Sequence, residues 1–211
     1  LIRNKPFTYV GEYYGVSDWE AKENIIDDNY RNYYQIFVYS FADSDGDGIG
    51  DINGVTEKLD YIAEMGFNGI WLMPIMPSTT YHKYDVTDYY NIDEQYGTLE
   101  DFEKLIEECD KRGIKLIIDL VMNHSSSKHP WFTQACEYLK GLPEGAEPNA
   151  EECPYVDYYH FSTQQLSSGW YKIPDSDYYY EGVFWSEMPD LNLESEAVKK
   201  EFEDIAKFWI D

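Results

Sequence analysis

Basic residues are scarce in this sequence. Only 16 Lys and Arg stand against 41 Asp and Glu among 211 residues, which gives a formal net charge of −25 at pH 7. So acidic a surface repels phosphate groups, and we therefore expect no nucleic acid among the partners of this protein. The same charge is compatible with the binding of cations and with a secreted protein.

Long apolar runs are also missing. No stretch reaches the roughly 18 apolar residues that a transmembrane helix requires, so we expect no membrane span. The first fifteen residues, LIRNKPFTYVGEYYG, lack the apolar core of a signal peptide. A chain whose signal peptide had been removed would look the same, so this absence does not decide where the protein resides.

Cysteine is rare as well. The three cysteines are an odd number and lack the spacing of a metal site. Cys109 falls on the apolar face of a predicted helix, where we expect a packed thiol. Cys136 and Cys153 flank a loop rich in Pro, Gly and Glu, and they could form a disulfide in an oxidising compartment or remain free thiols.

Aromatic residues, by contrast, are abundant: they make up 18% of the sequence, with 21 Tyr and 6 Trp. They can fill a core, but cores prefer Leu, Ile, Val and Phe, whereas Tyr and Trp are amphipathic. The excess suits equally well a surface that stacks on the flat apolar faces of sugar rings. Composition leaves both interpretations open.

Strand and helix patterns alternate along much of the chain. Thr98, with Asp101 three residues later, is an acidic variant of the capping box that begins a helix. Each connection between strands is long enough for parallel pairing, which predicts the α/β fold class. The predicted strands are Tyr33–Phe41, Phe67–Pro74 and a strand around Leu116–Ile118; the predicted helices run from Val55 to Gly66, from Thr98 to Gly113 and from Ser195 to Trp209.

Three β/α units cannot close a (β/α)₈ barrel, which needs eight. An open doubly wound sheet is the alternative, but its last helix would lead to no further strand, so we predict the first part of a larger, here incomplete, barrel. The alternation of strand and helix patterns stops in the middle of the chain, which predicts an irregular, partly β insertion. The divisions are 1–32, an N-terminal extension with one short helix near Trp19–Ile26; 33–124, barrel units; 125–189, the insertion; and 190–211, the return to the barrel.

Polar side chains follow the third predicted strand. Asp119, Asn123 and His124 come directly after its apolar run. The carboxyl end of a buried parallel strand is where ligands and catalytic groups gather. A buried Asp–His pair can equally be a hydrogen bond of the core, so these residues alone leave both interpretations open.

A second polar loop, Tyr81–Asp85, follows the preceding strand. Tyr84 can stack on a sugar ring and His82 can bond a hydroxyl, although a Tyr and a His in one surface loop are common. Two such loops at the ends of adjacent strands favour function over coincidence. Together they predict one wall of a sugar-binding cleft.

Acidic residues alternate with Gly in the loop after the first strand, residues 43–51. This spacing lets a tight loop direct several oxygens at one point, as Ca²⁺ requires. We therefore prefer a calcium site to the alternative interpretation, an acidic loop that is merely solvated. The loop resembles the start of an EF-hand, but its twelfth position is Gly54 instead of Glu, and it joins a strand to a helix. We therefore predict a calcium site outside the EF-hand class, with carboxylate ligands from Asp43, Asp45, Asp47 and Asp51 and the backbone carbonyl of Ile49.

Four motifs in order resemble the α-amylase family, glycoside hydrolase family 13. The resemblance covers the chain from about Tyr33 onward. The motifs are the acidic loop at 43–51, YHKYD at 81–85, DLVMNH at 119–124 and MPDLN at 188–192.

The resemblance implies a (β/α)₈ (TIM) barrel with a domain B inserted after strand three. It also implies retaining hydrolysis of α-glucosidic bonds, which needs two carboxyl groups about 5–5.5 Å apart. In the family the nucleophile Asp, the acid/base Glu and a third Asp follow strands four, five and seven. We therefore expect all three beyond Asp211, with a Gly-x-Arg-x-Asp pattern within about a dozen residues, and we expect this chain to be inactive by itself.

The resemblance also implies a role for each matched residue. His82 and His124 resemble residues that bond hydroxyls of the glucose at subsite −1, and Tyr84 resembles the ring that stacks beneath it. Asp119 resembles a supporting acid that holds the wall in place. Substrate-binding neighbours in the same loop are Tyr81 and Asp85, and possible ligands of a second calcium are Asn123 and Asn192.

Exo-acting α-glucosidases of the family carry an acid where this chain has Tyr81. The resemblance therefore favours an endo-acting enzyme on α-1,4 bonds of starch or maltooligosaccharides, completed by the remainder of the barrel. Alternatives are an exo-acting α-glucosidase, an oligo-1,6-glucosidase, a neopullulanase, a transglycosylase, or a non-catalytic fragment that binds calcium and sugar. We expect a protein secreted by a bacterium or held at its surface, with a cytoplasmic location as the open alternative.

Overall fold

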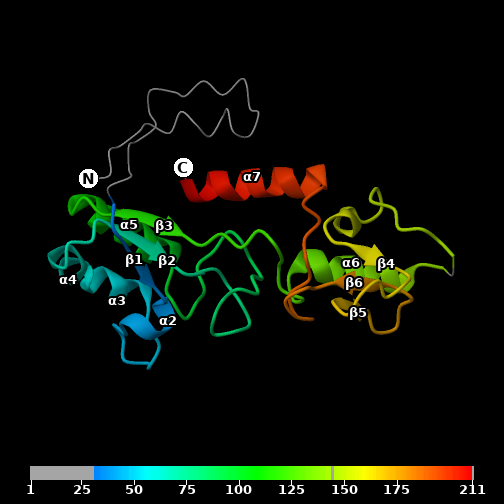
Figure 1. The fold of residues 1–211 in the computed structure, drawn as a ribbon, viewed down its shortest axis with the longest axis horizontal. Helices are drawn as coiled ribbons and strands as arrows, with labels where there is room; N and C mark the ends of the chain where they lie inside the picture. Colours follow the sequence, from blue (N-terminus) through cyan, green and yellow to red (C-terminus); the bar gives the residue numbers. More distant parts are fainter. Residues whose placement is uncertain (1–30, 144, 211) are drawn as a thin grey trace, which may run out of the picture.

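A computed structural model describes residues 31–143 and 145–210 of the chain. It has a first lobe (residues 31–118) around a parallel sheet and a second lobe (residues 125–189) around a helix and a small antiparallel sheet (Figure 1). The short helix predicted near Trp19–Ile26 lies outside the described residues.

The parallel sheet contains three strands, β1 (Tyr33–Ile36), β2 (Gly69–Leu72) and β3 (Lys115–Ile118), in the order β1-β2-β3. The register aligns their ends, because Ile36 pairs with Leu72 and Leu72 with Ile118. The predicted parallel α/β arrangement is therefore confirmed, and the loops after β2 and β3 leave the sheet side by side.

The prediction of one long first strand was wrong. The chain leaves β1 after Ile36 and forms a short helix, α2 (Val38–Phe41). The acidic loop folds back onto this helix, where Gly50 N–H donates to the Tyr39 carbonyl at 2.8 Å and Asp51 N–H to that of Ala42 at 3.0 Å. These tertiary hydrogen bonds outweigh the apolar pattern that predicted a strand.

The first predicted helix is divided in two, α3 (Ile52–Glu57) and α4 (Leu59–Glu64). Lys58 breaks it, with a φ of −97° and a ψ of 4°, and its N–H turns back to the carbonyls of Val55 and Thr56. Val55, Leu59 and Ile62 nevertheless reach one core, in which all three are buried. The apolar spacing therefore located the buried face correctly and missed the break.

The second predicted helix is confirmed as α5 (Leu99–Lys111). The Thr98 hydroxyl accepts from the Asp101 N–H, and the Asp101 carboxylate accepts from the Thr98 N–H, which completes the capping box. Gly113 follows with a φ of +67°, a conformation that favours glycine. Cys109 is buried on the apolar face, as predicted.

The second lobe contains a helix that the sequence pattern did not reveal. This is α6 (Pro130–Gly141), followed by the 3₁₀ turn η1 (Pro154–Asp157). Its antiparallel sheet has the order β4-β6-β5, with β4 at Phe161–Ser162, β5 at Trp170–Lys172 and β6 at Tyr179–Glu181. The expectation of an irregular, partly β segment was therefore wrong for residues 130–141.

Cys136 and Cys153 both lie in the core of this lobe as buried free thiols. Burial raises the pKa of Cys136 to about 12, which keeps its thiol protonated and unreactive. The disulfide, one of two alternatives open from the sequence, is not formed.

The third predicted helix is α7 (Glu196–Ile210), which runs along both lobes (Figure 1). Val198, Phe202 and Ile205 are buried in the core that contains α6. Near its end, the Trp209 indole N–H donates to the Tyr89 carbonyl at 2.8 Å, and its ring meets Phe102 of α5 at 5.6 Å between centroids. Helix α7 therefore ties the two lobes together.

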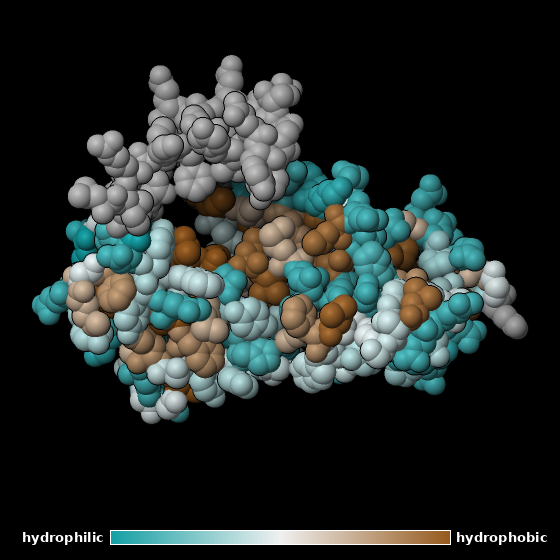
Figure 2. Space-filling model, in the orientation of Figure 1, coloured by the Kyte–Doolittle hydropathy of each residue, from teal (hydrophilic) through white to brown (hydrophobic). Residues whose placement is uncertain are grey.

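One face of the parallel sheet is left uncovered by described residues. Trp71 and Ile117 are neighbours in the register and are 37% and 45% exposed. Figure 2 shows apolar surface gathered along the middle of the molecule. An open sheet with an exposed apolar face agrees with an incomplete barrel.

No helix among residues 31–143 and 145–210 is both long and apolar enough to cross a bilayer.

A neutral histidine caps α6. His129 is 4% exposed, and its Nδ1 accepts from the Trp131 N–H at 3.1 Å. Burial lowers the pKa of His129 from 6.5 to about 4. Between these two values the unfolded chain binds more protons at this residue than the folded protein does, so stability falls as the pH drops through that window.

We therefore expect acid to destabilise the protein through His129, by about 2 kcal/mol of unfolding free energy between pH 7.5 and 5. Asn accepts the same capping hydrogen bond but does not titrate, so His129→Asn should remove about that much of the pH dependence. Urea unfolding of both proteins at the two pH values measures the difference. Equal pH dependence in both would contradict the role of His129.

Candidate active-site wall

A side-chain hydrogen bond links the loop after β2 to the residue that follows β3. Asp119 directly follows β3, and its backbone N–H still donates to the Leu72 carbonyl of β2 at 2.9 Å. The Tyr84 hydroxyl, from the loop after β2, donates to Asp119 Oδ2 at 2.8 Å. Burial and this carboxylate raise the pKa of Tyr84 to about 12, so the hydroxyl stays protonated and keeps its donor role.

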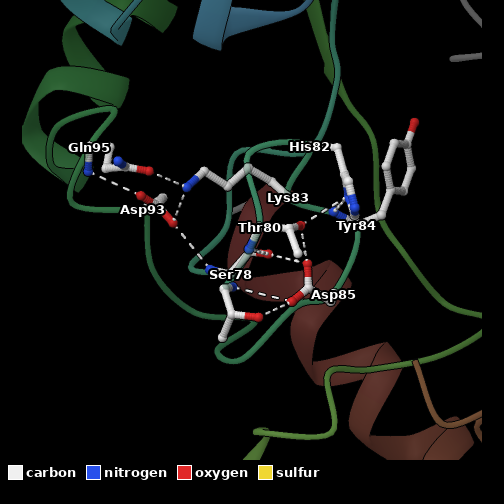
Figure 3. A network of polar contacts seen from close by, with 9 residues as sticks. Ser78, Thr80, His82, Lys83, Tyr84, Asp85, Asp93 and Gln95 are labelled. Atoms are coloured by element: carbon white, nitrogen blue, oxygen red, sulfur yellow. Dashed lines mark hydrogen bonds and ion pairs between the residues drawn. The ribbon is translucent and has the colours of Figure 1, made fainter. Parts of the chain in front are cut away.

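The loop after β2, residues 78–86, is closed at its base by an antiparallel bridge between Ser78 and Val86. Inside it, the fully buried Asp85 carboxylate accepts from the hydroxyls of Ser78, Thr79 and Thr80 (Figure 3). Burial raises the pKa of Asp85, but these hydrogen bonds outweigh it and leave the pKa below its usual value. Asp85, predicted as a substrate-binding neighbour, has no exposed surface and shapes the loop from within.

His82 is half-buried and held by its neighbours. Its Nδ1 lies 3.1 Å from the Thr80 hydroxyl and 3.1 Å from the Tyr84 N–H, which donates to it. Nδ1 is therefore engaged inside the loop, and the opposite edge of the ring is the part that can meet a ligand. His82 and Tyr84 lie on the same side of the loop (Figure 3).

His124 lies behind this loop. Its ring is only 5% exposed, its Nε2 is 3.1 Å from the Tyr84 carbonyl, and Phe184 packs against it at 5.4 Å between centroids. Burial lowers the pKa of His124, so the ring is neutral near pH 7. The structure thus brings Asp119 and His124 to Tyr84 from two sides.

Asn123 and Asn192 have different partners. Asn123 Nδ2 donates to Asp190 Oδ1 at 3.2 Å, whereas Asn192 Nδ2 donates to the Asp157 carbonyl at 3.2 Å. The segments are close, since the Leu191 N–H donates to the Asn123 carbonyl at 2.9 Å. Asp190, which sequence reasoning passed over, is the acid that joins the two loops, and its place within MPDLN is the signal that could have revealed it.

Tyr81 stands at the rim of the wall with 61% of its surface exposed. Its ring meets Phe37 at 6.2 Å, Tyr39 at 6.1 Å and His82 at 5.3 Å between centroids. Phe37 and Tyr39 were missed because they were assigned to a strand. Together these rings form an aromatic rim that continues from the cleft wall toward the end of β1.

The acidic loop brings three of its four acids together. Asp43, Asp45 and Asp51 each offer one carboxylate oxygen, and these oxygens lie within 4.8 Å of one another. Asp47 is outside this group, and its Oδ1 accepts from the Ile49 N–H at 2.7 Å. The five predicted ligands are therefore partly assembled.

The carboxyl group of Asp43 is favoured in its charged form, as a cation site needs. The N–H groups of Gly46 and Gly48 donate to Asp43 and lower the pKa of its carboxyl. Both glycines have a positive φ, +86° and +92°, which lets the chain turn these N–H groups inward. The candidate metal ligands are all oxygen atoms, and such a set fits a hard cation such as Ca²⁺.

Relatives of known kind match this chain over most of its length. A family model described as "Alpha amylase, catalytic domain" matches residues 35–211. Alpha-amylase 3 of Dictyoglomus thermophilum is 49% identical over 187 residues, which span 86% of this chain and 35% of that protein. An oligo-1,6-glucosidase of Parageobacillus thermoglucosidasius is 38% identical over 191 residues, which span 84% of this chain and 32% of that protein.

Solved structures of two related proteins resemble the fold of this chain. Eubacterium rectale Amy13B superimposes with a TM-score of 0.86 at 61% identity, covering 89% of this chain and 36% of that one. The alpha-amylase from H. orenii gives a TM-score of 0.70 at 47% identity, covering 85% of this chain and 37% of that one. The chain spans about a third of the length of these relatives. By the extent of these matches, the chain belongs to the α-amylase family, glycoside hydrolase family 13, and carries part of its catalytic domain.

Proposed function

We propose that the protein to which this chain belongs is a retaining glycoside hydrolase. It acts on α-1,4-glucosidic bonds of starch or maltooligosaccharides and cleaves within the chain. The observation that carries the proposal is the wall at the ends of β2 and β3, where Asp119 holds Tyr84 through a 2.8 Å hydrogen bond. A fixed aromatic ring beside hydroxyl-binding groups is the arrangement that sugar stacking requires.

Each side chain of the wall has a proposed task. Tyr84 stacks beneath the glucose at subsite −1, and the free edge of His82 bonds one of its hydroxyls. His124 supports the Tyr84 carbonyl in this arrangement, and it would bond a hydroxyl itself once a sugar displaces Phe184. Asp119 keeps Tyr84 oriented and takes no covalent part.

The catalytic carboxylates are proposed to lie in the part of the protein beyond this chain. Retaining hydrolysis needs a nucleophile and an acid/base about 5–5.5 Å apart, and Asp119 is already bound to Tyr84. Residues 125–189 would form domain B over the cleft, and the exposed face at Trp71 and Ile117 would pack against the remaining strands. This chain alone would then be inactive.

The endo-acting mode rests on Tyr81. An exo-acting enzyme must close the cleft beyond the terminal sugar and bind its hydroxyls, for which a carboxylate is suited. Here the position carries an exposed, uncharged ring in an aromatic rim. An open rim allows a glucan chain to continue past the wall, which favours internal cleavage over release of single glucose units.

Amylose digestion by the full-length protein separates these modes. Internal cleavage shortens long chains first, so we expect viscosity to fall early and maltooligosaccharides of mixed length to accumulate. Chromatography of the products alongside viscometry measures both. Glucose as the sole early product, with viscosity unchanged, would contradict the endo-acting mode and favour an exo-acting α-glucosidase.

We also propose that the acidic loop binds Ca²⁺ through Asp43, Asp45 and Asp51, joined by Asp47 and the Ile49 carbonyl after a local adjustment. An ion that binds only the folded protein stabilises it by about 2.7 kcal/mol at a hundred times its dissociation constant. Because the loop is hydrogen-bonded to α2 through Gly50 and Asp51, this stabilisation would reach the end of β1.

Chelation therefore should lower the melting temperature of the full-length protein by several degrees, and added Ca²⁺ should restore it. Asp45→Asn should lower the melting temperature and weaken the response to both treatments. The exposed Glu103 of α5 supplies a matched control, since Glu103→Gln also removes one surface charge and should respond like the parent. A parent protein that melts equally with and without EDTA would rule out a stabilising calcium site.

A further inference from the structure

Lys83 is a buried lysine in the middle of the loop at residues 78–86. It is 2% exposed, and its ammonium lies 2.8 Å from Asp93 Oδ2 and 2.6 Å from Gln95 Oε1. The ring of Tyr96 faces the same ammonium at 5.2 Å from its centroid. Lysine is almost never this deeply buried without partners, and here every neighbour of the ammonium stabilises its charge.

The backbone at Lys83 explains how the loop uses this anchor. Its φ is +62°, a left-handed conformation that is strained for a residue with a side chain. The turn sends the Lys83 side chain inward toward Asp93, while His82 and Tyr84 lie on the other side of the loop (Figure 3). The two candidate sugar contacts are thus the immediate neighbours of an inward anchor.

Asp93 extends the anchor to the base of the loop. The carboxylate oxygen that pairs with Lys83 also accepts from the Ser78 N–H at 3.1 Å, and the other accepts from the Gln95 N–H at 3.0 Å. Ser78 in turn donates its hydroxyl to Asp85. The ion pair therefore connects the turn of the loop to its base through groups with little freedom to move.

We propose that Lys83 is a positioning residue of the cleft wall, which through Asp93 holds His82 and Tyr84 in the geometry that a glucose ring requires. The proposal rests on the proposed function of that wall. Without the ammonium, the buried Asp93 carboxylate would lose its counter-charge, and the strained turn would lose its side-chain anchor to Asp93. Tyr84 would then leave its position on Asp119, and orientation lost at a reacting sugar lowers the rate steeply.

A double-mutant cycle on the full-length protein tests whether Lys83 acts through Tyr84. The variants are Lys83→Met, Tyr84→Ala and the two combined, each assayed for kcat and KM on maltoheptaose well below its melting temperature. We expect Lys83→Met to lower kcat/KM about tenfold or more in the parent, chiefly through kcat. In the Tyr84→Ala background only the effect through His82 remains, so we expect the same change to lower kcat/KM severalfold less than in the parent.

A core substitution supplies the matched control. Leu105 of α5 is fully buried in the core that contains α3 and α4, so Leu105→Ala should lower the melting temperature while leaving kcat/KM of the folded protein unchanged in either background. If Lys83→Met does not fold, Lys83→Met with Asp93→Asn removes both charges and enters the cycle in its place.

The outcomes separate the two proposals. An active parent in which Lys83→Met behaves like Leu105→Ala, or has equal effects in both backgrounds, would overturn the role of Lys83 and leave the proposed function intact. A parent that does not cleave maltoheptaose would overturn the proposed function, and the inference about Lys83 with it.

Discussion

The hydrogen bond between Tyr84 and Asp119 joins the loop after one strand to the end of its neighbour, and the rest of the candidate site depends on it. Parallel register brings the end of β3 beside the loop after β2, so the acid and the phenol meet at 2.8 Å. His124 then supports the Tyr84 carbonyl from behind. The Asp119 carboxylate, which is half-buried, thereby fixes the direction of the Tyr84 ring, which is half-buried as well.

The two lobes contribute to this wall in different ways. The first supplies the sheet that aligns the loops, and the second supplies Phe184, which packs against His124. Asp190, directly after the second lobe, accepts a hydrogen bond from Asn123. Helix α7 buries its apolar face in the core of the second lobe while Trp209 contacts the first. Contacts from outside the sheet thus stabilise the wall, although residues 31–143 and 145–210 leave one face of the sheet itself uncovered.

The sequence was informative wherever local signals and tertiary structure agreed. The capping box at Thr98, the glycine at Gly113 and the apolar runs of β2 and β3 predicted the elements that hold the site.

Prediction failed where tertiary contacts determined the backbone conformation. Helix α2 depends on hydrogen bonds from the acidic loop, and α6 was hidden by flanking Pro and Gly although its buried residues follow helical spacing. The buried Lys83 could not be found, because a charged residue between two loop residues ordinarily predicts exposure.

The central claim is that this wall receives a glucose unit on Tyr84. A crystal structure of the full-length protein with an uncleaved maltooligosaccharide tests it most directly. We predict one glucose ring stacked on the face of Tyr84, with a hydroxyl within hydrogen-bonding distance of His82 and with the Tyr84–Asp119 hydrogen bond preserved. A saccharide bound elsewhere, with no contact to Tyr84 or His82 at saturating concentration, would contradict the account.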